Sequence, residues 1–206
     1  MSPAQRRPDQ KAFILDEAAK LFAAKGYHAT GIADISEAVG LGRGALYHHI
    51  RSKEQLLFEI STLHVDELIA ASEKLIQDDK LTAADKLRGM GRVLMRNISD
   101  NLPSWTVFFR EVNSITGEYR ATVVERRRSY ERQWADVIAE GAASGEFRSV
   151  DPVIVKGILG MHNYSYLWLT AENGRLTPEE LADVFSTVFV GGLVAEPALA
   201  GDASVR

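Results

Sequence analysis

Three closely spaced glycines, Gly40, Gly42 and Gly44, are the first residues of this sequence whose spacing suggests a chemical role. With the alanine that follows, they fit the pattern G-x-G-x-x-[G/A], which lets a backbone approach a pyrophosphate in dinucleotide-binding folds. That role requires a buried β-strand directly before the glycines. The preceding stretch GIADISEAV instead carries Asp34 and Glu37 and spaces its apolar residues as in a helix, which argues against a nucleotide loop.

The same segment also fits a turn between two short helices that bind DNA. A first helix would end at Val39, the glycines would form the turn, and a second helix would begin at Arg43. Leu46 and Ile50, four residues apart, would face the core and leave the opposite face free to lie in a major groove. Arg43 can form a bidentate contact with guanine, and Tyr47 can donate a hydrogen bond to a phosphate. The sequence therefore favours a helix-turn-helix.

A longer stretch around this turn resembles a known family. Residues 30–57, TGIADISEAVGLGRGALYHHIRSKEQLL, and the pair Gly26-Tyr27 before them are similar to the DNA-binding signature of the tetracycline-repressor (TetR) family. The rest of the chain agrees with that family in length and helical order, although not in motif. The resemblance implies an N-terminal DNA-binding domain, a larger helical domain for an effector, and dimerisation through the last two long helices.

The resemblance also implies roles for individual residues. Thr30 and Tyr47 would contact phosphates, residues 43–45 would face bases, and His48 and Lys53 would hold the DNA backbone. Gly31 and Gly42 depart from the family pattern, which often has a hydroxyl-bearing residue at these helix N-caps. Glycine caps a helix at a cost of roughly a few tenths of a kcal/mol relative to serine. The predicted DNA-binding residues are Thr30, Gly31, Gly42, Arg43, Gly44, Ala45, Tyr47, His48 and Lys53.

The elements that must position these residues are helices throughout. Nearly every segment has the apolar spacing of a helix, and none shows sustained alternation between turn signals. We expect an all-α fold of about nine helices. Three short helices would form a DNA-binding domain over residues 1–55, and longer ones an effector-binding and dimerisation domain over residues 56–196. The small, polar tail 197–206 is predicted to be flexible.

Two start signals locate the last helices. Asp151 followed by Pro152 combines an N-cap residue with a proline at the first helical position, and predicts a helix to about residue 171. The signal recurs at Thr177, with a glutamate three residues on, and predicts a last helix to about residue 194.

Composition limits the kind of protein. The chain has 206 residues, and its 46% apolar and 25% charged residues are ordinary for a globular protein with a sizeable core. It has no cysteine, which excludes disulfides and thiolate metal sites. It has no run of about 18 apolar residues and no apolar stretch after the charges of MSPAQRRPDQ, so we expect a cytoplasmic protein without membrane contact.

Charge is distributed unevenly along the chain. The net charge of −4 argues against a protein that is basic all over. Up to residue 58 there are eight Lys and Arg against six Asp and Glu, a net +2, and the remainder has 16 against 22, a net −6. The asymmetry favours a polyanionic partner at the N-terminal end. Random scatter of surface charge is the alternative.

The last two helices carry apolar residues at helical spacing that predict a homodimer interface. Two helices from each chain would form a four-helix contact. The alternative is that this stripe belongs to the core of one chain. The predicted interface residues are Ile158, Met161, Leu181, Val184, Phe185, Val188 and Phe189.

The middle of the chain mixes aromatic and polar residues, in SWTVFFREVNSI and MHNYSYLWL. An apolar pocket with a few polar groups is typical of a small-molecule site, whereas a core of large residues is the alternative. In ERRRSYER, residues 125–132, four arginines would bind phosphates of an acyl-coenzyme A or form a solvated face. The predicted ligand-binding residues are Met90, Trp105, Phe108, Phe109, Arg110, Asn113, Trp134, His162 and Tyr166.

Together these patterns predict a ligand-responsive transcriptional regulator. A dimer would repress transcription by binding a palindromic double-stranded DNA operator, and a hydrophobic or acyl-coenzyme-A-like effector would release it by shifting the helix over residues 53–77. We expect no catalytic residue, cofactor or metal, because HExxH, GxSxG and a His/Asp cluster are missing from the sequence. A helical enzyme and a protein-binding adaptor are the alternatives, and steep salt dependence of binding would separate a DNA binder from both.

Overall fold

The structure, a computed structural model, describes residues 10–169 and 175–194 of the chain. These residues form nine α-helices and two short 3-10 helices, with one isolated antiparallel bridge between Phe147 and Val194. The prediction of an all-α fold of about nine helices is therefore confirmed. The tail 197–206 lies outside the described residues.

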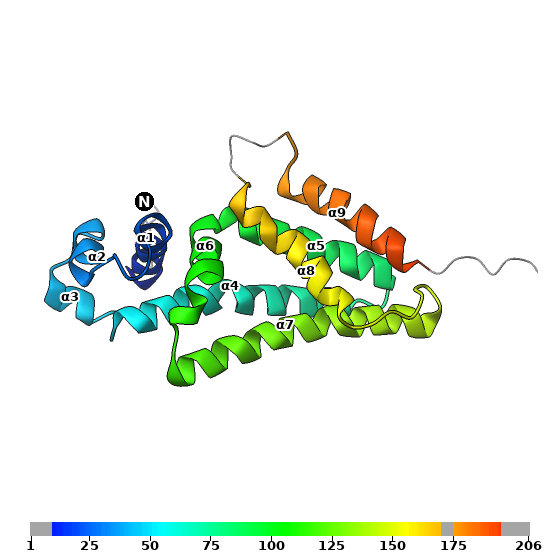
Figure 1. Ribbon diagram of the computed structural model, residues 1–206, viewed down its shortest axis with the longest axis horizontal. Helices are drawn as coiled ribbons and strands as arrows, with labels where there is room; N and C mark the ends of the chain where they lie inside the picture. The colour runs from blue at the N-terminus through cyan, green and yellow to red at the C-terminus, as the bar shows by residue number, and fades with distance from the viewer. Residues whose placement is uncertain (1–9, 170–174, 195–206) are drawn as a thin grey trace, which may run out of the picture.

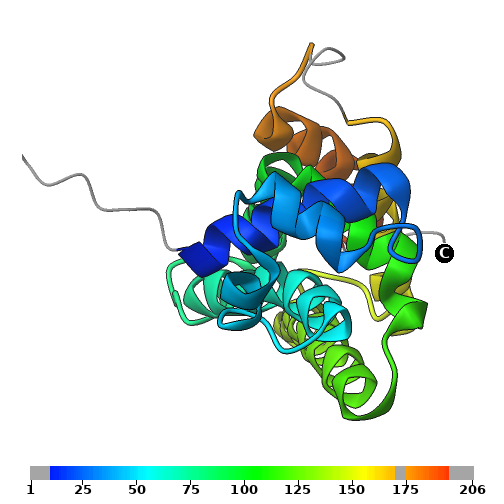
Figure 2. The same cartoon turned by 90° about the vertical axis from the view of Figure 1, so that its left-hand side faces the viewer.

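The helices divide into a small group at one end and a larger body (Figure 1). The small group, which we call the α1–α3 end, faces the viewer in Figure 2. It consists of α1 (Gln10–Lys25), α2 (Ile32–Ala38) and α3 (Arg43–Tyr47). The body consists of α4 (Lys53–Ile76), α5 (Ala83–Asp100), α6 (Leu102–Glu111), the 3-10 helix Val112–Ser114, α7 (Gly117–Ser144), α8 (Ile154–Asn163), the 3-10 helix Tyr164–Leu167 and α9 (Pro178–Leu193). Helix α4 begins at the α1–α3 end and runs along the body beside α7.

Several helix ends follow the signals in the sequence. Ser52 caps α4, where its Oγ accepts a hydrogen bond from the Gln55 N–H at 3.0 Å. Thr177 and Glu180 form a reciprocal capping box at the start of α9. Gly145 ends α7 in the left-handed conformation, at φ 80°, which a residue with a side chain rarely adopts.

Helix α8 is shorter than the sequence predicts. It begins at Ile154, because the Asp151 Oδ1 accepts from the Val153 N–H at 2.8 Å and the chain first makes i→i+3 turns. It ends at Asn163, where the chain tightens into the 3-10 helix Tyr164–Leu167. The tighter winding brings Tyr166 against the ring of Phe109, with centroids 4.8 Å apart. The expected single helix to residue 171 is therefore wrong.

Each part of the molecule has buried apolar residues of its own. At the α1–α3 end Phe22, Ile35, Leu46 and Ile50 are at most 1% exposed, so Leu46 and Ile50 face inward as their spacing predicts. In the body the indole of Trp134 is fully buried, with the rings of Tyr130, His162 and Phe189 around it. No helix in the described ranges has both the length and the apolarity needed to cross a bilayer.

Candidate functional site

Helix α3 presents an exposed polar face on top of a buried apolar one. Arg43, Gly44 and Tyr47 are all exposed, Tyr47 at 44%, while Leu46 behind them is fully buried. The Arg43 guanidinium lies 5.9 Å from the centroid of the Tyr47 ring, which orders both side chains on one surface. A Cβ built on Gly44 meets no described atom within 4 Å, so this position keeps the surface flat. Ala45 and His48 are exposed on the same helix and its C-cap.

The turn before α3 is that of a helix-turn-helix. Gly40 has φ +65°, a conformation that favours glycine, and its N–H donates to the Glu37 carbonyl at the end of α2. Gly42 is exposed, in extended conformation, and is the N-cap of α3. Because a helix, α2, precedes the glycines where a nucleotide loop requires a strand, the dinucleotide-binding alternative is excluded.

Two residues expected to contact phosphates are engaged within the protein. The Thr30 side chain is fully buried, and its Oγ1 donates to the Gly26 carbonyl at 2.9 Å. The Lys53 ammonium donates to the carbonyls of Tyr27 and Thr30, both at 3.0 Å, and lies 4.4 Å from the Tyr27 ring centroid. These bonds hold the α1–α2 connection against the start of α4. The buried Thr30 hydroxyl does not face a phosphate as expected, whereas a DNA contact by the half-buried Lys53 stays a prediction.

Gly31 is exposed at the N-cap of α2, where it offers no side-chain acceptor to the first turn of the helix. The Asp34 Oδ2 accepts a hydrogen bond from the Gly31 N–H at 2.7 Å. That bond, together with the nearby Lys25 ammonium, lowers the pKa of Asp34. The start of α2 therefore keeps the half of a capping box that the third helical residue supplies and lacks the half that a hydroxyl at position 31 would supply.

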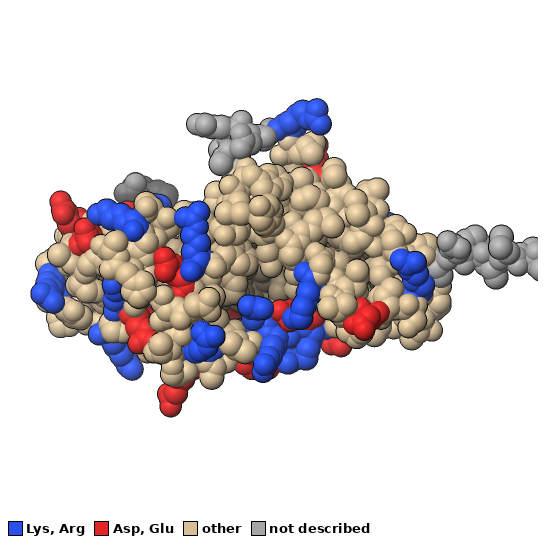
Figure 3. Space-filling model, viewed as in Figure 1, with Lys and Arg blue, Asp and Glu red and all other residues tan. Residues whose placement is uncertain are grey.

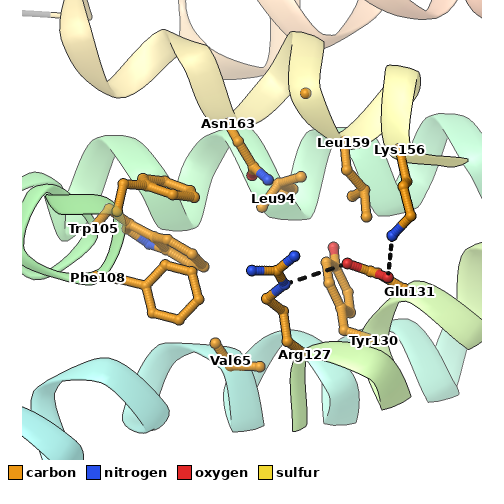
Figure 4. Close-up of a pocket in the computed structure, with 12 residues that line it drawn as sticks. Val65, Leu94, Trp105, Phe108, Arg127, Tyr130, Glu131, Lys156, Leu159 and Asn163 are labelled. Carbon is orange, nitrogen blue, oxygen red and sulfur yellow. Dashed lines mark hydrogen bonds and ion pairs between the residues drawn. The ribbon is translucent and has the colours of Figure 1, made fainter. Parts of the chain in front are cut away.

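The body contains a partly open cavity of about 230 Å³, lined by residues of α4 to α8 (Figure 4). Aromatic rings from α6 form one wall, and charged side chains from α7 and α8 form the opposite one. The Glu131 carboxylate accepts hydrogen bonds from the Lys156 ammonium at 3.1 Å and the Arg127 Nε at 3.3 Å. The lining residues are Val65, Leu94, Trp105, Phe108, Phe109, Arg127, Tyr130, Glu131, Lys156, Leu159, Gly160 and Asn163.

The nine residues expected to bind a ligand fall into three groups. Trp105, Phe108 and Phe109 line the cavity. Arg110 and Asn113 are exposed on the surface, and Tyr166 packs against the ring of Phe109 without lining the cavity itself. Met90, Trp134 and His162 are fully buried core residues that are not part of the lining, which corrects the expectation for them.

Nine lining residues were missed, and three of them lie in the arginine-rich stretch ERRRSYER: Arg127, Tyr130 and Glu131. That stretch was therefore a usable signal. Asn163 lies in the stretch MHNYSYLWL, which the sequence also singles out. The others come from three further helices, and no local pattern marks them: Val65, Leu94, Lys156, Leu159 and Gly160.

His162 is buried next to the cavity rather than in it. Its Nδ1 lies 2.8 Å from the Ile158 carbonyl, and its ring packs against Trp134, Phe185 and Phe189. Burial lowers the pKa of the His162 imidazole, because desolvation disfavours its charged form. The residue is therefore a neutral part of the core near pH 7.

A basic groove continues outward from the cavity. It has a volume of about 240 Å³, shares Glu131 and Lys156 with the cavity, and adds Arg128 and Arg132. Figure 3 shows Lys and Arg side chains gathered over α7 along the lower edge of the molecule. The apolar cavity thus opens beside a surface suited to anionic groups.

The expected dimer residues occupy two different faces. Val184 and Val188 are 51% and 63% exposed on α9, and Leu181, Phe185 and Met161 are partly exposed. Ile158 and Phe189 are only 1% and 7% exposed, since they point into the core of their own chain. For Ile158 and Phe189 the structure supports the alternative, in which these side chains belong to the core of a single chain.

Two polar contacts link the end of α6 and the segment after it to the α1–α3 end. The Glu111 Oε1 at the end of α6 accepts from the Tyr27 N–H at 3.2 Å. The His28 Nε2 and Ser114 Oγ lie 3.1 Å apart. Within the body, the Glu54 Oε1 on α4 accepts from the N–H and the hydroxyl of Thr116 at 3.1 and 2.7 Å, which lowers the pKa of Glu54. Helix α6 therefore touches both the cavity and the α1–α3 end.

Comparison with known proteins gives matches over almost the whole chain. Residues 14–60 match the family described as "Bacterial regulatory proteins, tetR family", and residues 80–193 match "Tetracyclin repressor-like, C-terminal domain". The HTH-type transcriptional repressor KstR2 of Mycolicibacterium smegmatis is 27% identical over 93% of this chain and 92% of its own length.

Two solved structures show the same architecture. The TetR family transcriptional regulator PfmR from Thermus thermophilus is 33% identical, with a TM-score of 0.80 over 88% of this chain and 99% of PfmR. AibR, in complex with isovaleryl coenzyme A and operator DNA, is 29% identical, with a TM-score of 0.77 over 87% of this chain and 97% of AibR. The match therefore extends across both the α1–α3 end and the body.

Proposed function

The chain belongs to the TetR family of bacterial regulatory proteins, and we propose that it is a repressor that binds an operator as a dimer and is released by an acyl-coenzyme A. The observation that carries this proposal is that one molecule has both an exposed Arg43/Tyr47 face and a partly open cavity with an aromatic wall. The similarity to the repressor KstR2 over nearly the full length supports repression as the mode of action.

The two-part cavity supports an effector that is apolar at one end and polyanionic at the other. The wall of Trp105, Phe108 and Phe109 suits an acyl group, and about 230 Å³ suits a short one. The neighbouring groove offers the cations Arg128, Arg132 and Lys156 to the phosphates of coenzyme A. AibR, which shares the fold, was solved with isovaleryl coenzyme A, so a short branched acyl chain is the first effector to test.

The exposed apolar side chains of α8 and α9 support a dimer. Val184 and Val188 on α9 and Val153 at the start of α8 are 51–63% exposed. Packing these faces against a second copy would remove them from water in a four-helix contact. A dimer would also present two α3 helices to half-sites about 34–36 Å apart on a palindromic operator.

Helix α6 is the element through which the effector would act on DNA binding. Its residues Trp105, Phe108 and Phe109 form the aromatic cavity wall, and Glu111, two residues further on at its C-terminal end, bonds to Tyr27. An effector that binds more tightly when α6 and the start of α4 are displaced would lower operator affinity. The sequence predicts a shift of α4 alone, and we add α6 as the helix that would connect the effector to the α1–α3 end.

A titration tests the proposal directly. Binding of the protein to the DNA upstream of its own gene is measured by fluorescence anisotropy at several salt concentrations, with and without isovaleryl coenzyme A. We expect affinity to fall steeply with salt, and to fall further with isovaleryl coenzyme A but not with coenzyme A or isovalerate alone. Absence of binding at low salt would contradict the regulator, whereas binding without release by any short acyl-coenzyme A would contradict the effector.

A further inference from the structure

Trp105, on the cavity wall, is connected by hydrogen bonds to the middle of α4. Its indole N–H donates to the Asn97 Oδ1 at 2.9 Å. The Asn97 Nδ2 donates in turn to the Glu67 Oε2 at 3.1 Å, and the His64 Nδ1 lies 2.9 Å from the same oxygen. We call Trp105, Asn97 and Glu67 the relay. It crosses from α6 through α5 to α4.

The chemistry at the two ends of the relay fixes the orientation of the Asn97 amide. An indole N–H can only donate, and an ionised carboxylate can only accept. The amide oxygen must therefore face Trp105 and the amide nitrogen must face Glu67. Because the two links use different atoms of Asn97, a substitution of nearly the same shape can break one and keep the other.

The relay lies between the cavity and an outer groove. Trp105 is only 5% exposed, lines the cavity, and stacks on Phe109 with ring centroids 5.6 Å apart. Asn97 and Glu67 line a groove on the outside of α4 and α5. Between α4 and α6, His64 and Trp105 border a space too small to hold a water molecule, so the two helices pack closely where the indole lies.

We propose that Asn97 and Glu67 are positioning residues that pass a displacement of Trp105 by the effector to α4, and so set how strongly effector binding weakens operator binding. This inference rests on the proposed function, because it concerns the coupling between its two sites. Helix α4 is continuous from Glu67 back to Lys53, which holds the α1–α2 connection. Neither Asn97 nor Glu67 belongs to the cavity lining, so the relay should change coupling rather than effector affinity.

Three variants separate the links. Trp105→Phe retains an aromatic ring beside Phe109 but removes the donor to Asn97. Asn97→Asp retains the acceptor for Trp105 but sets a carboxylate against Glu67 in place of a donor. Combining Asn97→Asp with Glu67→Gln restores the second link with reversed polarity. The glutamine NH2 group, in place of the shared Glu67 oxygen, can donate to the new carboxylate and to the His64 Nδ1 in the tautomer that accepts there.

The first measurement is the ratio of operator dissociation constants with and without saturating isovaleryl coenzyme A. We expect each single variant to reduce this ratio about threefold to tenfold, as for the loss of one hydrogen bond, and the double variant to recover most of it. Asn101→Asp makes the same change one turn further along, where the amide bonds to the Asn97 carbonyl of its own helix, and should leave the ratio unchanged. Calorimetry should show equal affinity of Asn97→Asp and wild type for isovaleryl coenzyme A.

An unchanged ratio in Asn97→Asp, or no recovery in the double variant, would overturn the relay. If Asn97 and Glu67 had only a structural role, Asn97→Asp and the double variant would both lose stability, and the double variant would not recover the ratio. Recovery of the ratio in the double variant therefore distinguishes the relay from a structural role.

Hydrogen exchange in the protein alone separates failure of the relay from failure of the proposed function. If isovaleryl coenzyme A does not release wild-type protein, the proposed effector is wrong and exchange decides the relay. We expect Asn97→Asp to speed amide exchange in the middle of α4 and in α1–α3 relative to Asn101→Asp, and the double variant to restore it. Unchanged exchange in these helices overturns the relay whether or not the effector is correct.

Discussion

The α1–α3 end and the cavity in the body differ in how their residues are spread along the chain. The exposed face of α3 is made by residues 43–48, whereas the cavity takes its lining from residues 65–163. A local face needs a short turn and two inward apolar residues, Leu46 and Ile50, to be set correctly. The cavity needs five helices, α4 to α8, to pack correctly before it exists. A contiguous motif can therefore be identified from sequence, while a dispersed site depends on the tertiary fold.

Trp134→Ala should have the largest effect, and it tests whether Trp134 belongs to the core of the body rather than to the cavity. Since Trp134 is fully buried, we expect the free energy of unfolding to fall by about 3–5 kcal/mol, measured by chemical denaturation. Phe109→Ala, on the cavity wall, should cost less stability and weaken effector binding more. If Trp134→Ala left stability unchanged but abolished effector binding, Trp134 would belong to the effector site, which would contradict its assignment to the core.

Arg43→Ala tests the local face without disturbing the body. Loss of a bidentate contact to guanine is worth about 1–3 kcal/mol, so we expect operator affinity to fall roughly fivefold to 150-fold in an anisotropy titration. Effector affinity and thermal stability should stay as in wild type, because the side chain is exposed. Arg88→Ala, an exposed arginine of α5, is the matched control. Equal operator affinity in the two variants would mean that Arg43 faces no base.

The buried His162 makes the stability of the body depend on pH. The pKa of the buried imidazole is lowered, so at pH values between it and the unfolded value of about 6.5 the unfolded state binds more protons. Stability is therefore fully present above about pH 6.5 and is lost as the pH falls below it, by up to about 1.4 kcal/mol per pH unit. Denaturation of wild type and His162→Gln at pH 5.5 and 7.5 measures the difference, and parallel losses would show that His162 does not contribute.

Gly42→Ser is expected to have the smallest effect, and it sharpens the description of the local face. Gly42 has extended backbone angles suited to an N-cap, and a Cβ there meets no described atom within 4 Å. The hydroxyl should stabilise α3 by roughly a few tenths of a kcal/mol in thermal unfolding. A rise in operator affinity with a steeper salt dependence would show that it also reaches a phosphate. Gly40→Ser, at φ +65°, should instead destabilise, and stabilisation by both would refute the N-cap explanation.

Sequence patterns predicted the helices and the α3 face because both depend on neighbours within one or two turns. The same patterns could not show that Thr30 and Lys53 bond to carbonyls of the α1–α2 connection, since that depends on how α4 begins against it. They also could not divide the stripe of α9 into an exposed side with Val188 and an inward side with Phe189. Both sides are apolar, and the packing of α9 on α5 and α7 decides which is buried.

The bonds of Lys53 have a consequence for how the molecule can move. The first residue of α4 is tied to the backbone of Tyr27 and Thr30, so the three N-terminal helices and the first turn of α4 should travel as one rigid unit. Structures captured in different effector states would then superimpose closely within residues 10–56, and would differ in the tilt of that unit on the body. In a dimer such a tilt would act as a lever, since a small rotation of α4 becomes a larger displacement at the distant tip that carries Arg43.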